Sequence, residues 1–179
     1  MARFILDSDH ASALFTVRHM MVTWVQGRFD KVTGSLSFDP HSTAGLSVEA
    51  SIETASIHTG IERRDDDLKS PNYFDVEKYP VISFKSTGAE ATGLDRCLVH
   101  GDLFIHGVTQ PVTLDVSFAG PSHFQDDDRV YTTYGFRARA RINREDFGMM
   151  TNMELEHGGC MVGRLAYLTI DAEADLVEE

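Results

Sequence analysis

The sequence has little basic charge. Its 16 lysines and arginines are outnumbered by 28 aspartates and glutamates, which gives a formal net charge of −12. Such a chain repels polyphosphate backbones and anionic headgroups, and no concentrated run of lysine or arginine offsets this repulsion. Nucleic acids and anionic membranes are therefore not expected as partners.

Long apolar runs and cysteine motifs are also missing. No apolar run approaches the roughly 20 residues that a spanning helix needs, so no integral membrane segment is expected. The first ten residues, MARFILDSDH, show no apolar signal-peptide core, which predicts a cytoplasmic protein, or a periplasmic one if the chain is a processed mature form. The two cysteines, Cys97 and Cys160, form no CxxC pair and are expected to be free, largely buried thiols.

Motifs for catalysis, cofactors and metals are absent as well. The sequence has no GxSxG elbow, and Gly158-Gly159 is too short to hold a pyrophosphate. His157 and Cys160 form an HxxC pair, but no set of cysteines and histidines has the spacing of a structural zinc site. We therefore expect no catalytic residue, cofactor or metal, and a protein that is not an enzyme. A catalytic triad assembled from distant residues stays open as an alternative.

Strict alternation of apolar and polar residues is what the sequence does contain. It runs through Leu46 to Glu53, Val112 to Phe118 and Phe136 to Ile142. Successive side chains of a strand point to opposite faces, so these segments are predicted strands with one wet side. Less regular strands are expected near Phe4 to Asp7, Ser12 to Arg18, Val22 to Phe38 with a break around Asp30 and Gly34, Val81 to Thr87, Leu94 to Ile105, and Leu165 to Ala172.

The overall pattern favours an all-β fold. Many β-rich segments separated by Gly, Pro and Asp clusters are typical of a sandwich or barrel. Ile61 to Lys69 is the one predicted helix, and it ends before Pro71. The acidic run Asp126 to Asp128 predicts a hairpin tip. No linker or repeat interrupts the chain, so residues 1–179 are expected to form a single domain.

The interior of such a barrel is either filled by side chains or open to one ligand. Small inward residues leave volume, and aromatic residues line or fill it; the candidates are Ala50, Ala138 and Ala140, and Phe15, Phe38, Phe84, Phe104, Phe118 and Phe136. From the residues alone the two outcomes are equally open. Methionine adapts to an irregular tail, so Met20, Met21, Met149, Met150 and Met153 are candidates for the lining, with gap filling as the alternative.

Four segments, in this order, resemble the YceI-like family of polyisoprenoid-binding, lipocalin-like bacterial proteins. They are Asp7 to Phe29, Ser56 to Thr87, Leu103 to Leu114 (LFIHGVTQPVTL) and Ile142 to Met149 (INREDFGM). The resemblance implies an eight-stranded antiparallel lipocalin-like barrel with one or two short helices. It also implies an elongated apolar cavity for a long isoprenoid, such as an isoprenoid quinone or a polyprenyl compound, and a homodimer. Ala11, His58 and Asp67 depart from the family pattern.

The expected site combines both arguments. Cavity candidates are Phe15, Val17, His19, Met20, Phe29, Phe38, Ala50, Phe84, Phe104, Phe136, Ala138, Phe147, Met149 and Met150. Candidates for a headgroup contact or the rim are Arg64, Asp65, Asn143, Arg144 and Asp146. The alternative for the polar set is structural, with Asp146 capping its turn while it pairs with Arg144. The expected function is to carry or store an isoprenoid lipid; the alternatives are a scavenger of other hydrophobic molecules and an enzyme.

Overall fold

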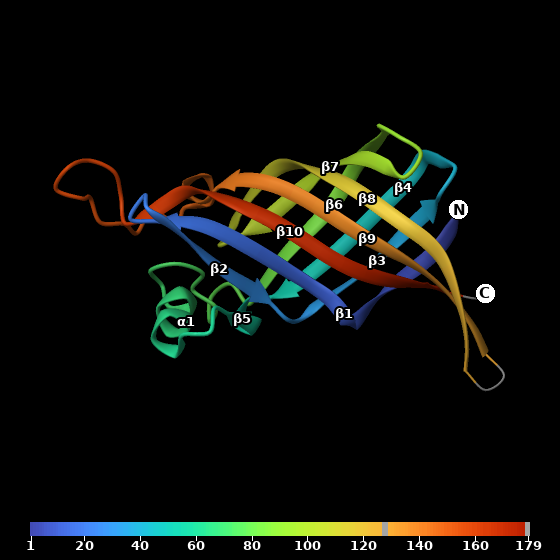
Figure 1. Ribbon diagram of the computed structural model, residues 1–179, viewed down its shortest axis with the longest axis horizontal. Coiled ribbons are helices and arrows are strands. Elements are labelled where there is room, and N and C mark those ends of the chain that lie inside the picture. The colour runs from blue at the N-terminus through green and yellow to red at the C-terminus, as the bar shows by residue number, and fades with distance from the viewer. Residues whose placement is uncertain (127–128, 178–179) are drawn as a thin grey trace.

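The computed structural model describes residues 1–126 and 129–177, and Asp127 and Asp128 of the expected hairpin tip lie outside the described residues. The chain forms antiparallel strands, as predicted (Figure 1). Their bounds are β1 Ala2–His19, β2 Thr23–Phe29, β3 Val32–Asp39, β4 Ser42–Glu53, β5 Ile57–His58, β6 Val81–Ala91, β7 Arg96–Ile105, β8 Val108–Asp126, β9 Arg129–Asn143 and β10 Val162–Leu176.

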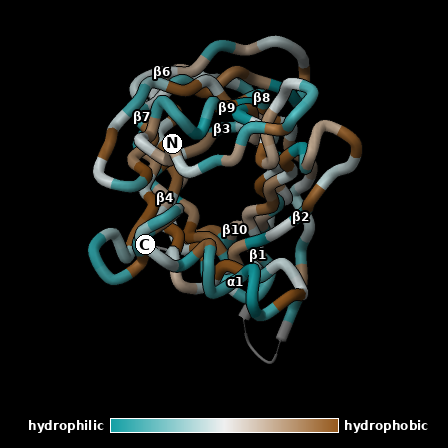
Figure 2. The backbone as a smooth tube through the Cα atoms, turned by 90° about the vertical axis from the view of Figure 1, so that its left-hand side faces the viewer, coloured by the Kyte–Doolittle hydropathy of each residue, from teal (hydrophilic) through white to brown (hydrophobic). Residues whose placement is uncertain are grey.

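Eight of these strands close into a barrel. They follow the order β10-β9-β8-β7-β6-β4-β3-β1, and β1 pairs back onto β10. Figure 2 shows the strands as a ring around the long axis. Closure leaves the sheet without open edges there, because every wall strand has a neighbour on each side. The predicted eight-stranded antiparallel barrel is confirmed.

On the side away from β10, the long strand β1 pairs with two strands, one after the other. Its first residues pair with β3, where Ala2 is opposite Phe38, and its second half pairs with β2, where Ala13 is opposite Phe29. The short β5 adds to the outer edge of β2. The helix α1, Glu62–Lys69, lies beside β5 (Figure 1) and begins one residue after the predicted start. Two 3₁₀ turns, Thr54–Ser56 and Arg144–Phe147, complete the short helical segments.

The alternation in the sequence corresponds to the two faces of the wall. In β9, Phe136, Ala138 and Ile142 face inward, and the arginines between them, Arg137, Arg139 and Arg141, are exposed. Burying three guanidiniums on one face would carry a large desolvation penalty, so this register is strongly preferred.

Two expected strands are continuous in the structure. The segments Phe4 to Asp7 and Ser12 to Arg18 form the single strand β1, whose register against β10 shifts between Leu6 and Ala11. This bulge carries the polar residues that break the alternation, and a bulge bends a strand without ending it. Alternation alone therefore could not show that the strand continues.

Both termini lie at the same end of the barrel (Figure 1), and aromatic side chains pack together there. Phe38 makes edge-on contacts with Phe4 and Tyr134, with ring centroids 6.0 and 5.2 Å apart. At the other end Phe74, which follows α1, packs on Phe29 with a centroid separation of 5.4 Å. None of the described helices has the length and apolar character needed to cross a membrane.

Candidate functional site

An apolar cavity of about 240 Å³ lies inside the barrel. Phe136, Ala138 and Ile142 of β9 all line it, and the six residue steps from Phe136 to Ile142 cover roughly 20 Å. A volume this large exceeds a packing defect by far, since a single water needs only about 10–15 Å³ measured in the same way. The interior is therefore open, and the alternative of a barrel filled by its own side chains does not apply.

Most of the expected cavity residues line this space. They come from strands far apart in the sequence and from the segment after β9: Phe15, Val17, Phe29, Phe38, Ala50, Phe84, Phe136, Ala138 and Met149. Phe118 lines it too, whereas Ala140 does not. The long-range pairing of the barrel brings these side chains together.

Five of the expected cavity residues do not line it. Phe104 lies between Leu103 and Ile105, which both line the cavity, so its side chain points to the outer face. Phe147 is 1% exposed and belongs to the core beneath its 3₁₀ turn. His19 is the last residue of β1, beyond a second shift of register after Val17. Met20 and Met150 are 43% and 63% exposed.

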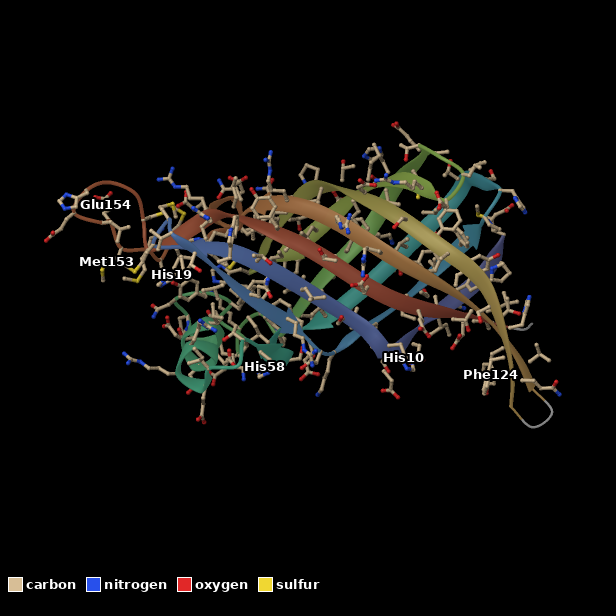
Figure 3. The ribbon with its side chains drawn as sticks, viewed as in Figure 1. His10, His19, His58, Phe124, Met153 and Glu154 are labelled. Carbon is tan, nitrogen blue, oxygen red and sulfur yellow. The ribbon has the colours of Figure 1, made fainter. Side chains whose placement is uncertain are left out.

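The methionines divide into one lining residue and four surface residues. Met149 is 5% exposed and lines the cavity, whereas Met21 and Met153 are 37% and 59% exposed, like Met20 and Met150. Met20 and Met21 have positive φ angles in the turn between β1 and β2, and Figure 3 shows Met153 in the loop that extends beyond the barrel. Residue type alone could not distinguish these positions, because the flexible methionine side chain fits both irregular cores and exposed binding surfaces.

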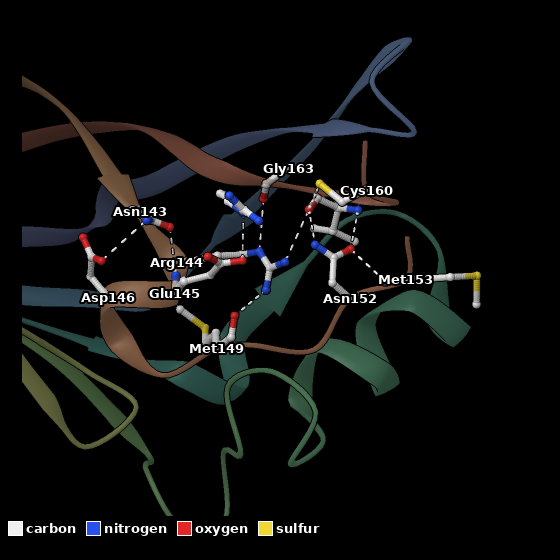
Figure 4. A network of polar contacts seen from close by, with 11 residues as sticks. Asn143, Arg144, Glu145, Asp146, Met149, Asn152, Met153, Cys160 and Gly163 are labelled. Atoms are coloured by element: carbon white, nitrogen blue, oxygen red, sulfur yellow. Dashed lines mark hydrogen bonds and ion pairs between the residues drawn. The ribbon is translucent and has the colours of Figure 1, made fainter. Parts of the chain in front are cut away.

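Arg144 is the one charged side chain among the lining residues, all of which belong to the described part of the chain. It is 5% exposed and donates to three main-chain carbonyl oxygens (Figure 4). The Nε donates to Gly163 at 3.1 Å, Nη2 to Val162 at 3.3 Å, and Nη1 to Met149. These bonds hold the loop between β9 and β10 against the Arg144 side chain, which is also among the residues that line the cavity.

The other rim candidates of this segment point away from the cavity. The Asn143 side chain accepts from the Glu145 amide at 3.1 Å and is 3.5 Å from an Asp146 carboxylate oxygen. Asp146 is exposed and has no ion pair with Arg144 among the described residues. The expected pairing of Asp146 with Arg144 is therefore wrong, because Arg144 turns inward to the main chain while Asp146 turns to solvent.

Arg64 and Asp65 connect α1 to β5 and do not line the cavity. Asp65 accepts from the Thr59 amide at 2.8 Å and from the Thr59 hydroxyl at 2.5 Å, and His58 lies 3.4 Å away. Burial raises the pKa of Asp65, but these hydrogen bonds outweigh it and hold that pKa below its usual value. Arg64 donates to the hydroxyl and the carbonyl of Thr59. Arg64 and Asp65 thus have a structural role, which was the alternative to a headgroup contact. His58, which departs from the family pattern, belongs to the same network.

Sequence reasoning missed the part of the wall that α1 and its following segment provide. Leu68, Tyr73 and Phe74 all line the cavity. Burial raises the pKa of Tyr73, Asp67 raises it further, and the nearby Arg144 charge lowers it. The helix has too few apolar residues for its periodicity to reveal an inward face. The adjacent aromatic residues Tyr73 and Phe74, four and five residues after the end of the helix, are a signal that could have indicated this part of the wall.

Cys97 is another wall residue that the alternation argument did not single out. It is 2% exposed and lines the cavity, and burial raises the pKa of its thiol. Both cysteines are free, as expected; Cys97 is buried and Cys160 is partly exposed. The cavity thus holds a protonated thiol, a phenol and one guanidinium, and its other lining side chains are almost entirely apolar.

Comparison with known proteins yields one family. A model of the YceI-like domain matches residues 4–174. A UPF0312 protein of Staphylococcus aureus is 34% identical over 178 residues, which cover 99% of this chain and 100% of the relative. A UPF0312 protein of Vibrio cholerae is 33% identical over 150 residues, covering 83% of this chain and 78% of the relative.

Solved structures show the same fold. The Campylobacter jejuni YCEI protein is 25% identical with a TM-score of 0.71, and the match covers 90% of each chain. BcnA of Burkholderia cenocepacia is 22% identical with a TM-score of 0.78, covering 94% of this chain and 98% of that one. A polyisoprenoid binding domain from Saccharophagus degradans has a TM-score of 0.68 at 17% identity, covering 99% and 100%. From the match over residues 4–174 and the full-length relatives, the chain belongs to the YceI-like family.

Proposed function

We propose that this protein carries or stores a long-chain isoprenoid lipid in its barrel cavity and performs no chemistry on it. The observation that supports this most directly is the open apolar channel, whose wall follows roughly 20 Å of β9. The polyisoprenoid binding domain of Saccharophagus degradans, which has the same fold, points to the same class of ligand.

The driving force is burial of the hydrocarbon tail. At about 0.8 kcal/mol for each buried methylene, a tail of about 20 carbons gains about 16 kcal/mol, which exceeds the roughly 4–15 kcal/mol lost with translational and rotational freedom. Branched isoprenoid tails suit a wall in which rings alternate with small residues such as Ala50 and Ala138. Depth then selects the chain length, and the few polar groups select the headgroup.

The two alternatives differ in what they require of the cavity. Catalysis predicts a titratable group inside the cavity that has a strongly shifted pKa and lies beside a partner. Among the described lining residues the titratable groups are Tyr73, Cys97 and Arg144, and no histidine or carboxylate is with them. A scavenger of other hydrophobic molecules needs only the same apolar walls, so the mass of the bound ligand separates it from an isoprenoid carrier.

Native mass spectrometry of the purified protein, followed by organic extraction, tests the proposal. An isoprenoid of one mass that copurifies, or that binds after incubation with prenols and quinones, is the expected result. A chain that stays unliganded after such incubation contradicts the proposal, and an unrelated amphiphile favours the scavenger. The same spectra measure the homodimer that the family resemblance implies.

A matched pair of variants tests whether the lipid occupies the barrel interior. Ala50 lines the cavity, and its neighbour Ser51 is on the exposed face of β4. Ala50→Phe places a ring in the channel, and Ser51→Phe adds the same ring outside. Lipid binding is expected to fall at least about tenfold in Ala50→Phe and to persist in Ser51→Phe. Equal binding by both folded variants places the lipid elsewhere.

A further inference from the structure

Arg144 is a buried cation without an anionic partner in the described part of the protein. It is 5% exposed, and its hydrogen bonds go to the carbonyl oxygens of Met149, Val162 and Gly163. The neighbouring carboxylate, Glu145, pairs instead with Arg164 at 3.2 Å. Removing a charge from water without a counter-charge is unfavourable. The carbonyl dipoles offset this only in part.

The guanidinium also has hydrogen-bonding capacity left. It carries five N–H donors in a planar fork, and its described bonds number three. Arg144 is also among the residues that line the cavity, so a ligand inside the barrel lies beside this side chain. The same planar fork binds carboxylates and phosphates through two parallel hydrogen bonds.

Tyr73 provides a second donor at this end of the cavity. Its side chain lines the cavity, and no described residue forms a hydrogen bond with its hydroxyl. Arg144 is close enough for its charge to lower the pKa of Tyr73, while the exposed Asp67 acts in the opposite direction. A phenol and a guanidinium from two separate segments thus both line a cavity whose wall is otherwise almost entirely apolar.

Aromatic and apolar side chains pack together at the opposite end of the cavity. Phe38 lines the cavity there and contacts Phe118 and Tyr134 with centroid separations of 4.9 and 5.2 Å. A ligand with one polar end and one apolar tail therefore has a single favourable direction. Its polar end lies at Arg144 and Tyr73, and its tail points to the aromatic end.

We infer that the polar end of the ligand is an oxyanion, a carboxylate or a phosphate ester, bound by Arg144 with a hydrogen bond from Tyr73. This inference rests on the proposed function and adds the charge and direction of the lipid. An oxyanion supplies the missing counter-charge and accepts the unused N–H groups. A neutral alcohol or a quinone accepts a hydrogen bond and leaves the buried charge uncompensated.

Three lipids with the same C20 prenyl tail separate these cases: geranylgeraniol, geranylgeranoic acid and geranylgeranyl monophosphate. Affinities are measured with the full chain by native mass spectrometry and by competition with a fluorescent fatty acid. The charged lipids are expected to bind at least about tenfold more tightly than the alcohol, the gain typical of a charge-assisted hydrogen bond. The stronger of the two anions identifies carboxylate or phosphate.

Variants assign the effect to the two residues. Arg144→Gln is expected to abolish the preference for the anions while leaving the affinity for geranylgeraniol within about twofold. Tyr73→Phe, which removes only the hydroxyl, is expected to reduce the preference by a smaller factor. Arg139→Gln is the matched control, because Arg139 is exposed on the outer face of β9 and the substitution changes the net charge equally.

The outcomes separate the two proposals. Equal binding of all three lipids by the wild-type protein overturns the oxyanion site and leaves the carrier function intact. Binding of none overturns the carrier function itself. If Arg144→Gln fails to fold because its carbonyl contacts are lost, the wild-type comparison and Tyr73→Phe still test the oxyanion site. An equal loss of anion preference in Tyr73→Phe and Arg139→Gln counts against the site.

Discussion

The ring of Phe15 lies directly over Gly27, its partner across the β1–β2 pair. A Cβ atom at position 27 would be 2.3 Å from Cζ of Phe15 and 2.9 Å from Cγ2 of Thr59. The absent side chain thus provides the space in which this ring lies against the wall. Phe15 is 8% exposed and lines the cavity, so its position affects both the core and the open volume.

Gly27→Ala is therefore expected to destabilise the protein by about 1–3 kcal/mol, the usual effect of adding atoms to a packed site. Urea unfolding measures the change. Gly135→Ala in β9 is the matched control, because a Cβ at that position meets nothing within 4 Å, and it is expected to be neutral or slightly stabilising. Similar destabilisation by both variants would show that the contact with Phe15 is not the cause.

Cys97 is expected to resist thiol reagents in the native state. The thiolate is the reactive form, and burial raises the pKa of the Cys97 thiol. Two single-cysteine variants allow the comparison: Cys160→Ser leaves Cys97, and Cys97→Ser leaves Cys160. Ellman's reagent should modify Cys97 at least about tenfold more slowly than Cys160, because burial of Cys97 limits access to its thiol and lowers its thiolate fraction. Because Cys97 lines the cavity, a bound lipid should slow it further. Rapid native reaction at Cys97 would contradict the described burial.

The β1 bulge contains a pH-dependent pair. His10 Nδ1 is 2.7 Å from an Asp7 carboxylate oxygen, and this hydrogen bond raises the pKa of His10 and lowers that of Asp7. The His10 contribution to stability is complete below its unfolded pKa and is lost as pH rises through its raised folded pKa. The Asp7 contribution is present above its unfolded pKa and is lost as pH falls through its lowered folded pKa. The pair is thus strongest between about pH 4 and 6.5.

An NMR titration of the His10 ring tests this pair. Asp7→Asn is expected to return the pKa of His10 toward its ordinary value, since the Asp7 hydrogen bond is the largest cause of the shift. Glu173→Gln should have a smaller effect, because the Glu173 carboxylate is 4.0 Å away and acts by charge alone. A larger effect from Glu173→Gln would reverse this assignment.

Phe38 is expected to limit the length of the lipid tail. It is 2% exposed and belongs to the aromatic group that packs together at one end of the cavity. Phe38→Leu should shift binding toward longer chains in a competition between C20 and C40 prenols. It should also destabilise the fold by about 1–3 kcal/mol, within the usual range for a buried substitution. Phe104→Leu, on the outer face of β7, should leave the chain-length preference unchanged, and an equal shift in both variants would count against this role of Phe38.

The sequence alone predicted most of the architecture. Alternation in β4, β8 and β9 assigned the wet and dry faces, since the period of a strand is independent of its neighbours. It could not place Phe104, because Leu103, Phe104 and Ile105 are all apolar and either face fits the pattern. Nor could it predict the bulge in β1, since the polar residues that interrupt the alternation resemble the end of a strand.

The sequence by itself therefore determined most of the strands, the one α-helix, the acidic surface and the resemblance to a family. Tertiary structure decided whether the barrel is open or filled, and it decided the inward direction of Arg144. Both depend on contacts between distant segments: Phe15 over Gly27, Phe38 against Phe4 and Tyr134, and Arg144 on the carbonyls of Val162 and Gly163. Cavity volume is the space that such long-range packing leaves unoccupied, and local periodicity contains no information about it.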